Sequence, residues 1–228
     1  MADVINPFVS DFVNRGILKT PEIINAFKKI DRANFVPKEL KQNAYVNEPL
    51  PIGDGQTISQ PYTVAFMMEL LRPGAGDKIF EIGFGSGWQT ALLAHIVSQK
   101  KSEARNPKSE TKGTIFAVER IPELYRFGRK NIAKYGFIKN GIVKTIGGDA
   151  TLGLKRHAPF DRIIAAASAE ELPAIWLKEL KVGGRLVAPV KNSIWLYIKE
   201  SDLPAGRQEN NFEKKEYPGF IFVSLITK

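Results

Sequence analysis

The sequence of 228 residues contains no cysteine. This absence excludes disulfides, thiolate nucleophiles and cysteine-based zinc sites, and it fits a cytoplasmic protein. The two histidines, His95 and His157, are too far apart to form a typical metal site, so no bound metal is expected. No apolar run approaches the ~20 residues that a membrane-spanning helix needs. The first residues also lack the basic and apolar stretches of a signal peptide.

The formal net charge is +9, from 33 basic and 24 acidic residues. A basic surface favours acidic partners, including nucleic acid. The basic residues are nevertheless scattered, and the densest clusters, Lys100-Lys101 and Lys214-Lys215, lie in polar segments. We interpret them as solvated loops and expect neither a nucleic-acid partner nor a membrane. With 43% hydrophobic residues, the chain can bury one sizeable core, which indicates a single domain.

Residues 78–87, KIFEIGFGSG, carry the clearest local pattern. A short apolar run, Ile79, Phe80 and Ile82, is interrupted by Glu81 and meets a glycine-rich turn, after which residues 88–94 are expected to form a helix. This is the opening of a nucleotide-binding βαβ unit. The glycines follow GxGxG, and Trp88 stands where a dinucleotide-binding loop needs its third glycine. Together with Glu81, this favours S-adenosylmethionine over NAD, the alternative being a tight turn that binds nothing. No lysine follows the loop, which disfavours ATP.

Two further predicted strands end in acidic residues. Residues 114–118 lead into Glu119, and residues 142–146 are followed closely by Asp149. A carboxylate at the end of the second strand can accept hydrogen bonds from both hydroxyls of a ribose, the alternative being an ordinary strand-end acid. Ligands bind outside the carboxyl ends of strands in such sheets. Glu81, Glu119 and Asp149 lie at the ends of three successive predicted strands, and together they therefore indicate a nucleoside ligand.

The alternation of strands and helices predicts an α/β fold. We expect a doubly wound, mostly parallel, Rossmann-like sheet with an antiparallel edge strand and a helical N-terminal cap. Residues 193–199 and 220–225 should pair as the closing hairpin, with a polar loop at 200–216 between them. Residues 98–112 are expected to form a surface insertion. Residues 48–55 leave little room for regular structure, and Ser59 is either a helix N-cap or a site residue.

The sequence resembles the protein-L-isoaspartate O-methyltransferases, which are class I S-adenosylmethionine-dependent methyltransferases. The similarity spans roughly residues 20–200 and the final strand. Residues 49–62 are its most specific part, because they separate this family from most other class I methyltransferases. The matching segments are residues 49–53, 55–62, 81–83, 85–87, 119–121, 148–149, 159–161, 183–187 and 189–190.

The resemblance implies transfer of a methyl group from S-adenosylmethionine to the free carboxylate of L-isoaspartyl residues in damaged proteins, with S-adenosylhomocysteine as product. The ester then recloses to a succinimide, which hydrolyses partly to aspartate. Residues 1–63 would form the cap and substrate segment, residues 64–228 the core, and the protein would be a monomer. Ser59 would be the catalytic residue. The implied cofactor-binding residues are Thr57, Gln60, Glu81, Gly83, Phe84, Gly85, Ser86, Gly87, Glu119, Arg120, Asp149 and Ala150.

Three positions depart from the family pattern. Ala150 replaces a glycine, Ala166 replaces a threonine, and Lys191 replaces a glycine. These changes concern substrate range more than cofactor binding. They leave open a second hypothesis, an S-adenosylmethionine-dependent methyltransferase that acts on RNA or a small molecule. A third is a non-catalytic binding module that keeps the fold.

Overall fold

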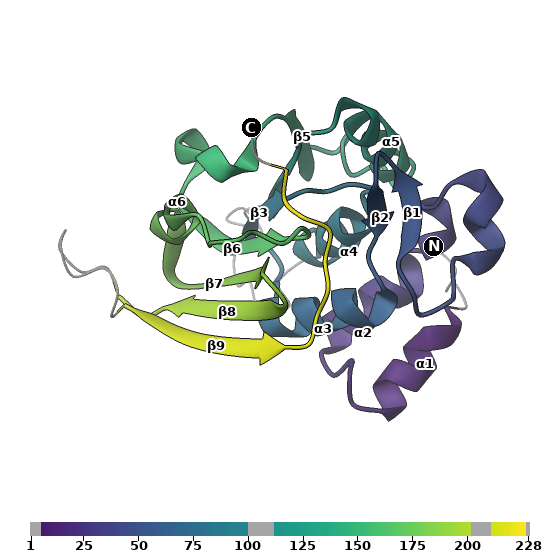
Figure 1. The fold of residues 1–228 in the computed structure, drawn as a ribbon, viewed down its shortest axis with the longest axis horizontal. Helices are drawn as coiled ribbons and strands as arrows, with labels where there is room; N and C mark the ends of the chain where they lie inside the picture. Colours follow the sequence, from purple (N-terminus) through teal and green to yellow (C-terminus); the bar gives the residue numbers. More distant parts are fainter. Residues whose placement is uncertain (1–5, 100–111, 202–210, 227–228) are drawn as a thin grey trace.

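A computed structural model of the chain describes residues 6–99, 112–201 and 211–226. A seven-stranded sheet, in the order β5-β4-β3-β6-β7-β8-β9, forms its centre, and β1 and β2 pair separately (Figure 1). The strands are β1 (Leu50–Gly53), β2 (Gln56–Ile58), β3 (Lys78–Ile82), β4 (Thr114–Glu119), β5 (Val143–Gly147), β6 (Phe160–Ala165), β7 (Leu180–Val190), β8 (Ser193–Lys199) and β9 (Phe212–Pro218). The helices are α1 (Pro7–Asn14), α2 (Pro21–Lys29), α3 (Pro61–Leu71), α4 (Trp88–Val97), α5 (Pro122–Ala133) and α6 (Ala174–Lys178), with short 3₁₀ helices η1 (Arg32–Asn34), η2 (Lys38–Asn43), η4 (Ala150–Leu152) and η5 (Lys155–His157).

The sheet confirms the predicted fold class. Strands β3 to β7 are parallel to one another, whereas β7, β8 and β9 follow one another as antiparallel neighbours. Proline occupies the first turn of α2, α3 and α5, where its missing N–H leaves no helical bond unmade. Because β3, β4 and β5 are parallel neighbours, their carboxyl ends meet at one edge of the sheet, as the order of the acidic residues along the chain predicts.

The predicted pairing of residues 193–199 with residues 220–225 is wrong. The partner of β8 is β9, which lies mostly within the expected polar loop at 200–216. Four consecutive residues of β9, from Glu213 to Glu216, are exposed. Charged residues are common on edge strands, because they discourage further pairing, and here they hide the apolar alternation of a strand. Much of the predicted insertion at 98–112, and residues 202–210 of the loop, lie outside the described residues.

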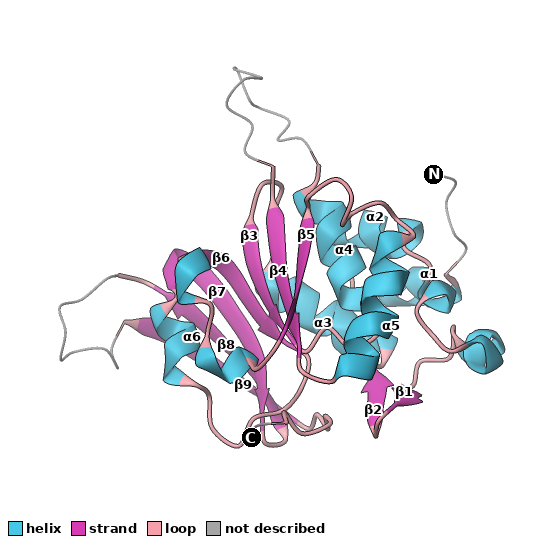
Figure 2. Ribbon diagram, turned by 90° about the horizontal axis from the view of Figure 1, so that it is seen from above, coloured by secondary structure: helices cyan, strands magenta, loops and turns pink. Residues whose placement is uncertain are grey.

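Residues 48–55 are also more regular than predicted. β1 and β2 form an antiparallel hairpin, and the turn between them contains Asp54 (φ 51°) and Gly55 (φ 69°). Asp-Gly is a strong signal for a tight hairpin turn with positive φ at both central residues. The hairpin lies beside α5 at the carboxyl-end edge of the sheet (Figure 2).

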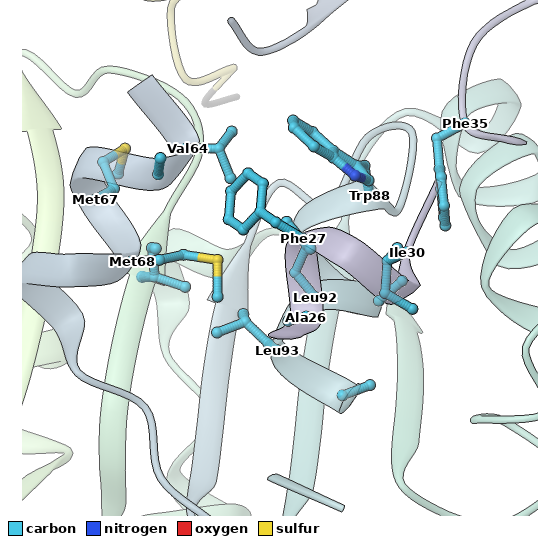
Figure 3. Packing of buried hydrophobic residues seen from close by; sticks show 14 of the residues in the cluster. Ala26, Phe27, Ile30, Phe35, Val64, Met67, Met68, Trp88, Leu92 and Leu93 are labelled. Carbon is cyan, nitrogen blue, oxygen red and sulfur yellow. The ribbon is translucent and has the colours of Figure 1, made fainter. Parts of the chain in front are cut away.

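Helices cover both faces of the sheet. Figure 2 shows α3, α4 and α5 on one face and α6 on the other, with α1 and α2 outside α4. The large cluster on the first face contains Phe27 and Trp88, whose rings meet edge to face with centroids 5.6 Å apart (Figure 3). A smaller cluster around Phe160 and Trp176 lies under α6. No helix in the described ranges is long and apolar enough to cross a bilayer.

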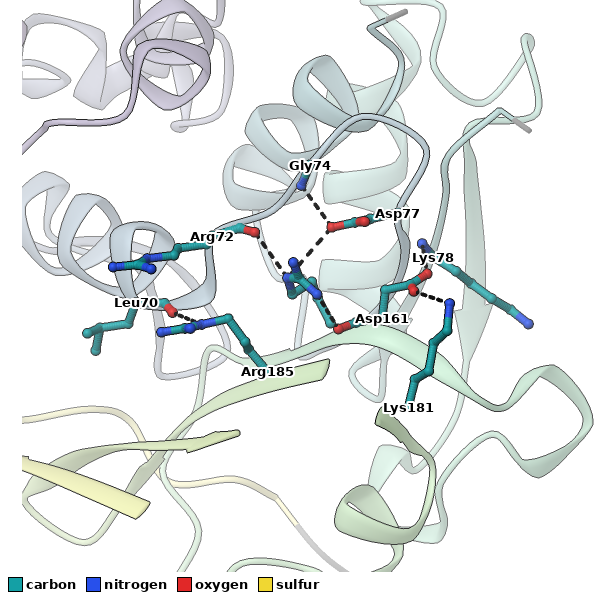
Figure 4. A network of polar contacts seen from close by, with 9 residues as sticks. Leu70, Arg72, Gly74, Asp77, Lys78, Asp161, Lys181 and Arg185 are labelled. Carbon is teal, nitrogen blue, oxygen red and sulfur yellow. Dashed lines mark hydrogen bonds and ion pairs between the residues drawn. The ribbon is translucent and has the colours of Figure 1, made fainter. Parts of the chain in front are cut away.

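Polar contacts hold the opposite edge of the sheet, where the parallel strands begin (Figure 4). Asp161 accepts hydrogen bonds from the backbone N–H of Lys78 (2.9 Å) and from Lys181 Nζ (2.9 Å). Arg185 donates to the carbonyl of Leu70 at the end of α3 (2.7 Å). These contacts join β3, β6, β7 and α3 at one edge, which leaves the carboxyl ends free to build a site.

Candidate active site

The glycine-rich turn between β3 and α4 is held close to the neighbouring elements. Gly83 (φ 74°) and Gly85 (φ 49°) have backbone conformations that favour glycine. The Gly83 N–H donates to the carbonyl of Val118 at the end of β4 (2.9 Å). A methyl group placed on Gly128 of α5 would lie 2.2 Å from the carbonyl oxygen of Gly85. Gly128 thus lets α5 support the turn from behind, a role that its isolated position in a helical pattern does not reveal.

We expect Gly128→Ala to destabilise the protein, although alanine normally favours a helix more than glycine does. The added methyl group must displace the Gly85 backbone, and such overpacking costs about 1–3 kcal/mol. Thermal unfolding should therefore show a melting temperature lowered by several degrees. Lys130→Ala, at an exposed position of the same helix, serves as the control. An unchanged or raised melting temperature for Gly128→Ala would show that the turn yields easily.

Glu119 joins the second strand end to the glycine turn. Its side chain accepts hydrogen bonds from the backbone N–H groups of Gly85 and Ile121, both at 2.9 Å. The residue is only 6% exposed. A carboxylate has about four lone-pair sites, so these two bonds leave acceptor capacity for a ligand. Glu119 therefore both fixes the turn and presents acceptor sites to the cleft beside it.

Glu81 is fully buried at the end of β3. Burial raises the pKa of Glu81 to about 7; the neighbouring side chains of Thr90 and Gln89 lower it, and the charge of Glu119 raises it. Gln89 Nε2 donates to the carboxylate over 3.2 Å. A buried acid that titrates near neutrality beside a cleft is suited to meet a cationic group.

Asp149 lies in an ion pair at the third strand end. Arg120 Nη1 is 2.8 Å from its carboxylate, and the N–H of Thr151 donates to it over 2.9 Å. Burial raises the pKa of Asp149, but the bonds from Thr151 and Arg120 outweigh it and hold the pKa below its usual value. Asp149 is therefore ionised at neutral pH, and it closes the cleft on the side of β5.

These groups surround one cleft of about 830 Å³, part of it open to solvent. The predicted site residues that line it are Thr57, Ser59, Glu81, Gly83, Phe84, Gly85, Ser86, Glu119, Arg120, Asp149 and Ala150. Gln60 and Gly87 do not line it. Gln60 donates to the carbonyl of Asn47 (2.9 Å), and Gly87 is the N-cap of α4.

Ser59 is half-buried and belongs to the segment between the hairpin and α3. It is not a helix N-cap, because Gln60 holds that position. Its backbone carbonyl accepts a hydrogen bond from Arg32 (3.1 Å). Within the described ranges its hydroxyl makes no hydrogen bond, so the hydroxyl is available to a ligand in the cleft.

Residues 223–226 form a wall of the cleft that the sequence patterns did not reveal. The C-terminal segment crosses the carboxyl ends of the strands (Figure 1). Ser168 holds it through two backbone bonds, donating to Val223 (2.9 Å) and accepting from Leu225 (2.7 Å). Phe220 stacks on Phe66 of α3, with ring centroids 5.2 Å apart. Phe220 thus packs on α3, and within residues 220–225 Ser224 makes an isolated parallel bridge to Ser168 instead of pairing with β8.

Comparison with known proteins decides the family. The chain matches the family described as protein-L-isoaspartate(D-aspartate) O-methyltransferase over residues 5–228. The chain belongs to this family. It is 45% identical to the protein-L-isoaspartate O-methyltransferase of Staphylothermus marinus, over 80% of this chain and 77% of that one. It is 39% identical to the corresponding protein of Methanopyrus kandleri, over 92% and 86%. The resemblance to isoaspartyl methyltransferases is confirmed.

Solved structures agree with the fold of the isoaspartyl methyltransferase family. A crystal structure of a protein-L-isoaspartate O-methyltransferase from Plasmodium falciparum, in complex with S-adenosyl-L-homocysteine, has a TM-score of 0.79. It is 22% identical, and the alignment covers 99% of both chains. A second protein-L-isoaspartate O-methyltransferase structure has a TM-score of 0.80 over 98% of this chain and 66% of that one, also at 22% identity. The similarity extends over the helical cap as well as the sheet.

Proposed function

We propose that this protein transfers the methyl group of S-adenosylmethionine to the free carboxylate of L-isoaspartyl residues in damaged proteins. One observation carries the proposal: Ser59 and the glycine turn, from segments separated along the chain, line the same cleft. Membership of the isoaspartyl methyltransferase family supports the reaction and the cofactor. The nearest alternative is methylation of RNA or a small molecule by the same fold.

The residues of the cleft suit S-adenosylmethionine. The glycine turn allows a ligand to approach the backbone, Glu81 offers a buried carboxylate to a cation, and Glu119 offers acceptors to ribose hydroxyls. Asp149, beside Arg120, would lie near the base. When bound, the cofactor supplies a sulfonium methyl group that is already activated for transfer.

The substrate carboxylate needs no general base, because an α-carboxyl group is already ionised near neutral pH. The protein must instead hold it in line with the methyl group. Ser59 would donate a hydrogen bond that orients the carboxylate. Ile52, Val64 and Leu124, which also line the cleft, would limit access of water to the reacting groups.

Two of the departures from the family pattern lie in the cleft itself. Ala150 and Ala166 line it, whereas Lys191 does not. We propose that Ala166, which is smaller than threonine, alters which peptides fit, whereas Ala150 adds a methyl group on the cofactor side of the cleft. The expectations of a cytoplasmic monomer with no nucleic-acid partner stay predictions.

The proposed function is tested with radiolabelled S-adenosylmethionine and two peptides that differ only in an isoaspartyl or a normal aspartyl linkage. Methyl transfer to the isoaspartyl peptide alone is expected. Cofactor binding without transfer to that peptide would refute the proposal, and transfer to an RNA or small-molecule library would favour the alternative.

Cofactor binding should depend on pH through Glu81. Its pKa is about 7 in the ligand-free protein, so the carboxyl group is mostly protonated at lower pH. A cationic ligand must then displace that proton in order to bind. Affinity should therefore be nearly constant above pH 8 and weaken by up to about tenfold per unit below pH 7. Calorimetry with S-adenosylhomocysteine, whose ammonium group keeps its charge in this range, measures this. Glu81→Gln should flatten the profile; an unchanged profile in that variant would assign the proton to another group.

A further inference from the structure

Arg32 is a charged residue that lies wholly inside the protein, with 0% of its surface exposed. It belongs to η1, outside the cleft and the sheet. Its guanidinium donates to four backbone carbonyls. These are Ala44 (2.8 Å) and Val46 (3.3 Å) through Nη1, and Glu48 (2.9 Å) and Ser59 (3.1 Å) through Nη2.

No carboxylate compensates this charge within the described ranges of the chain. Burial lowers the pKa of Arg32 to about 10, so the guanidinium stays protonated at neutral pH. The carbonyl dipoles and the face of Trp88, whose ring centroid is 5.3 Å from the guanidinium carbon, stabilise it instead. An apolar residue at this position would leave the four carbonyls without their donor, so the guanidinium links the separate segments that carry them.

The contacts of Arg32 join the two parts of the candidate site. Residues 44–48 lead into β1 and Ser59 follows β2, so one side chain holds both ends of the hairpin. Trp88 is the first residue of α4, directly after the glycine turn, and Figure 3 shows it packed in the cluster that contains Phe27 and Phe35. Arg32 thereby sets the separation between Ser59 and the turn.

We propose that Arg32 is a positioning residue for methyl transfer, holding Ser59 in register with the glycine turn. This inference rests on the proposed function and on the role of Ser59 in it. Arg32 donates to the backbone carbonyl of Ser59, so the Ser59 hydroxyl stays available to the substrate. Arginine suits the task because its rigid fork spreads five donors over three nitrogens and can span separated carbonyls, whereas the three donors of lysine share one nitrogen.

The test is Arg32→Lys, which keeps a positive charge near Trp88 but loses the fork. Turnover of the isoaspartyl peptide at saturating substrates should fall by about 30- to 100-fold, as expected for a small misplacement of a reacting group. The dissociation constant for S-adenosylhomocysteine should stay within threefold. Asn34→Ala is the matched control. This variant removes the hydrogen bond from Asn34, in the same 3₁₀ helix, to the hydroxyl of Tyr135 just after α5 (3.0 Å). It does not change a contact with the hairpin and should leave turnover within threefold.

A double-mutant cycle with Ser59→Ala separates positioning from general damage. In the Ser59→Ala background, Arg32→Lys should lower the residual turnover by no more than threefold. Three results would each overturn the role of Arg32. These are equal losses of turnover in both backgrounds, wild-type turnover in Arg32→Lys, and wild-type turnover in Ser59→Ala. The proposed function would survive all three results, because the isoaspartyl peptide would still be methylated. If the wild-type protein transfers no methyl group to the isoaspartyl peptide, both proposals fail together.

Discussion

Ser59→Ala should lower the turnover of an isoaspartyl peptide by about 10²- to 10³-fold, the usual cost of removing one hydrogen-bond donor that orients or stabilises a reacting oxygen. The Ser59 hydroxyl lines the cleft, and its backbone carbonyl is bound separately by Arg32. Loss of the hydroxyl should therefore leave the hairpin and the glycine turn in place. Single-turnover methyl transfer with labelled cofactor measures the chemical step directly.

Cofactor affinity distinguishes this role from a structural one. The dissociation constant for S-adenosylhomocysteine should stay within threefold in Ser59→Ala. Ser98→Ala, at the far end of α4, is the matched control and should behave as wild type. A large loss of cofactor affinity in Ser59→Ala, with the rate of the bound complex intact, would make Ser59 a cofactor residue and not a catalytic one.

Glu119→Gln should weaken cofactor binding by about 10²-fold. The carboxylate accepts two backbone N–H bonds, one of them from Gly85 in the turn. A glutamine amide has one acceptor oxygen, so its NH₂ group must face one of these donors. Each hydrogen bond to a charged group is worth about 1.5–3 kcal/mol, and the lost charge-assisted bonds to the ligand add to the loosened turn. Isothermal titration calorimetry gives the affinity.

The control for Glu119→Gln is Glu123→Gln, at an exposed acid in the first turn of α5 that pairs only with Arg126 among the described residues. It should bind the cofactor as wild type does. A change below threefold in Glu119→Gln would mean that Glu119 only supports the turn. In that case the ribose hydroxyls must be bound by another group of the cleft.

The local parts of the site were predictable because they depend on chain order alone. In a parallel sheet the carboxyl ends of successive strands share one edge, so Glu81, Glu119 and Asp149 had to converge. The glycine pattern at residues 83–87 needs no distant contact to form a tight turn. The family resemblance then supplied Ser59, which strand and helix patterns left undecided.

Other parts depend on contacts between residues far apart in sequence. Gly128 matters because α5 passes within contact of the Gly85 carbonyl, and nothing near Gly128 in the sequence signals this. The exposed charges of β9 hid a strand, whereas residues 220–225 have a strand-like apolar spacing but place Phe220 on α3 and residues 223–225 along the cleft. A local pattern reports which side chains seek burial but not which surface buries them.

The sequence by itself determined the parallel part of the sheet, the edge at which the ligand site forms and the acidic groups at the strand ends, because these follow from periodicity and strand order. Only the tertiary structure decided how the site is closed. Residues 223–226 became a wall of the cleft through their bonds to Ser168, and Arg32 came to hold Ser59 beside Trp88. The physical reason is that these contacts join segments whose approach is set by packing of the whole core.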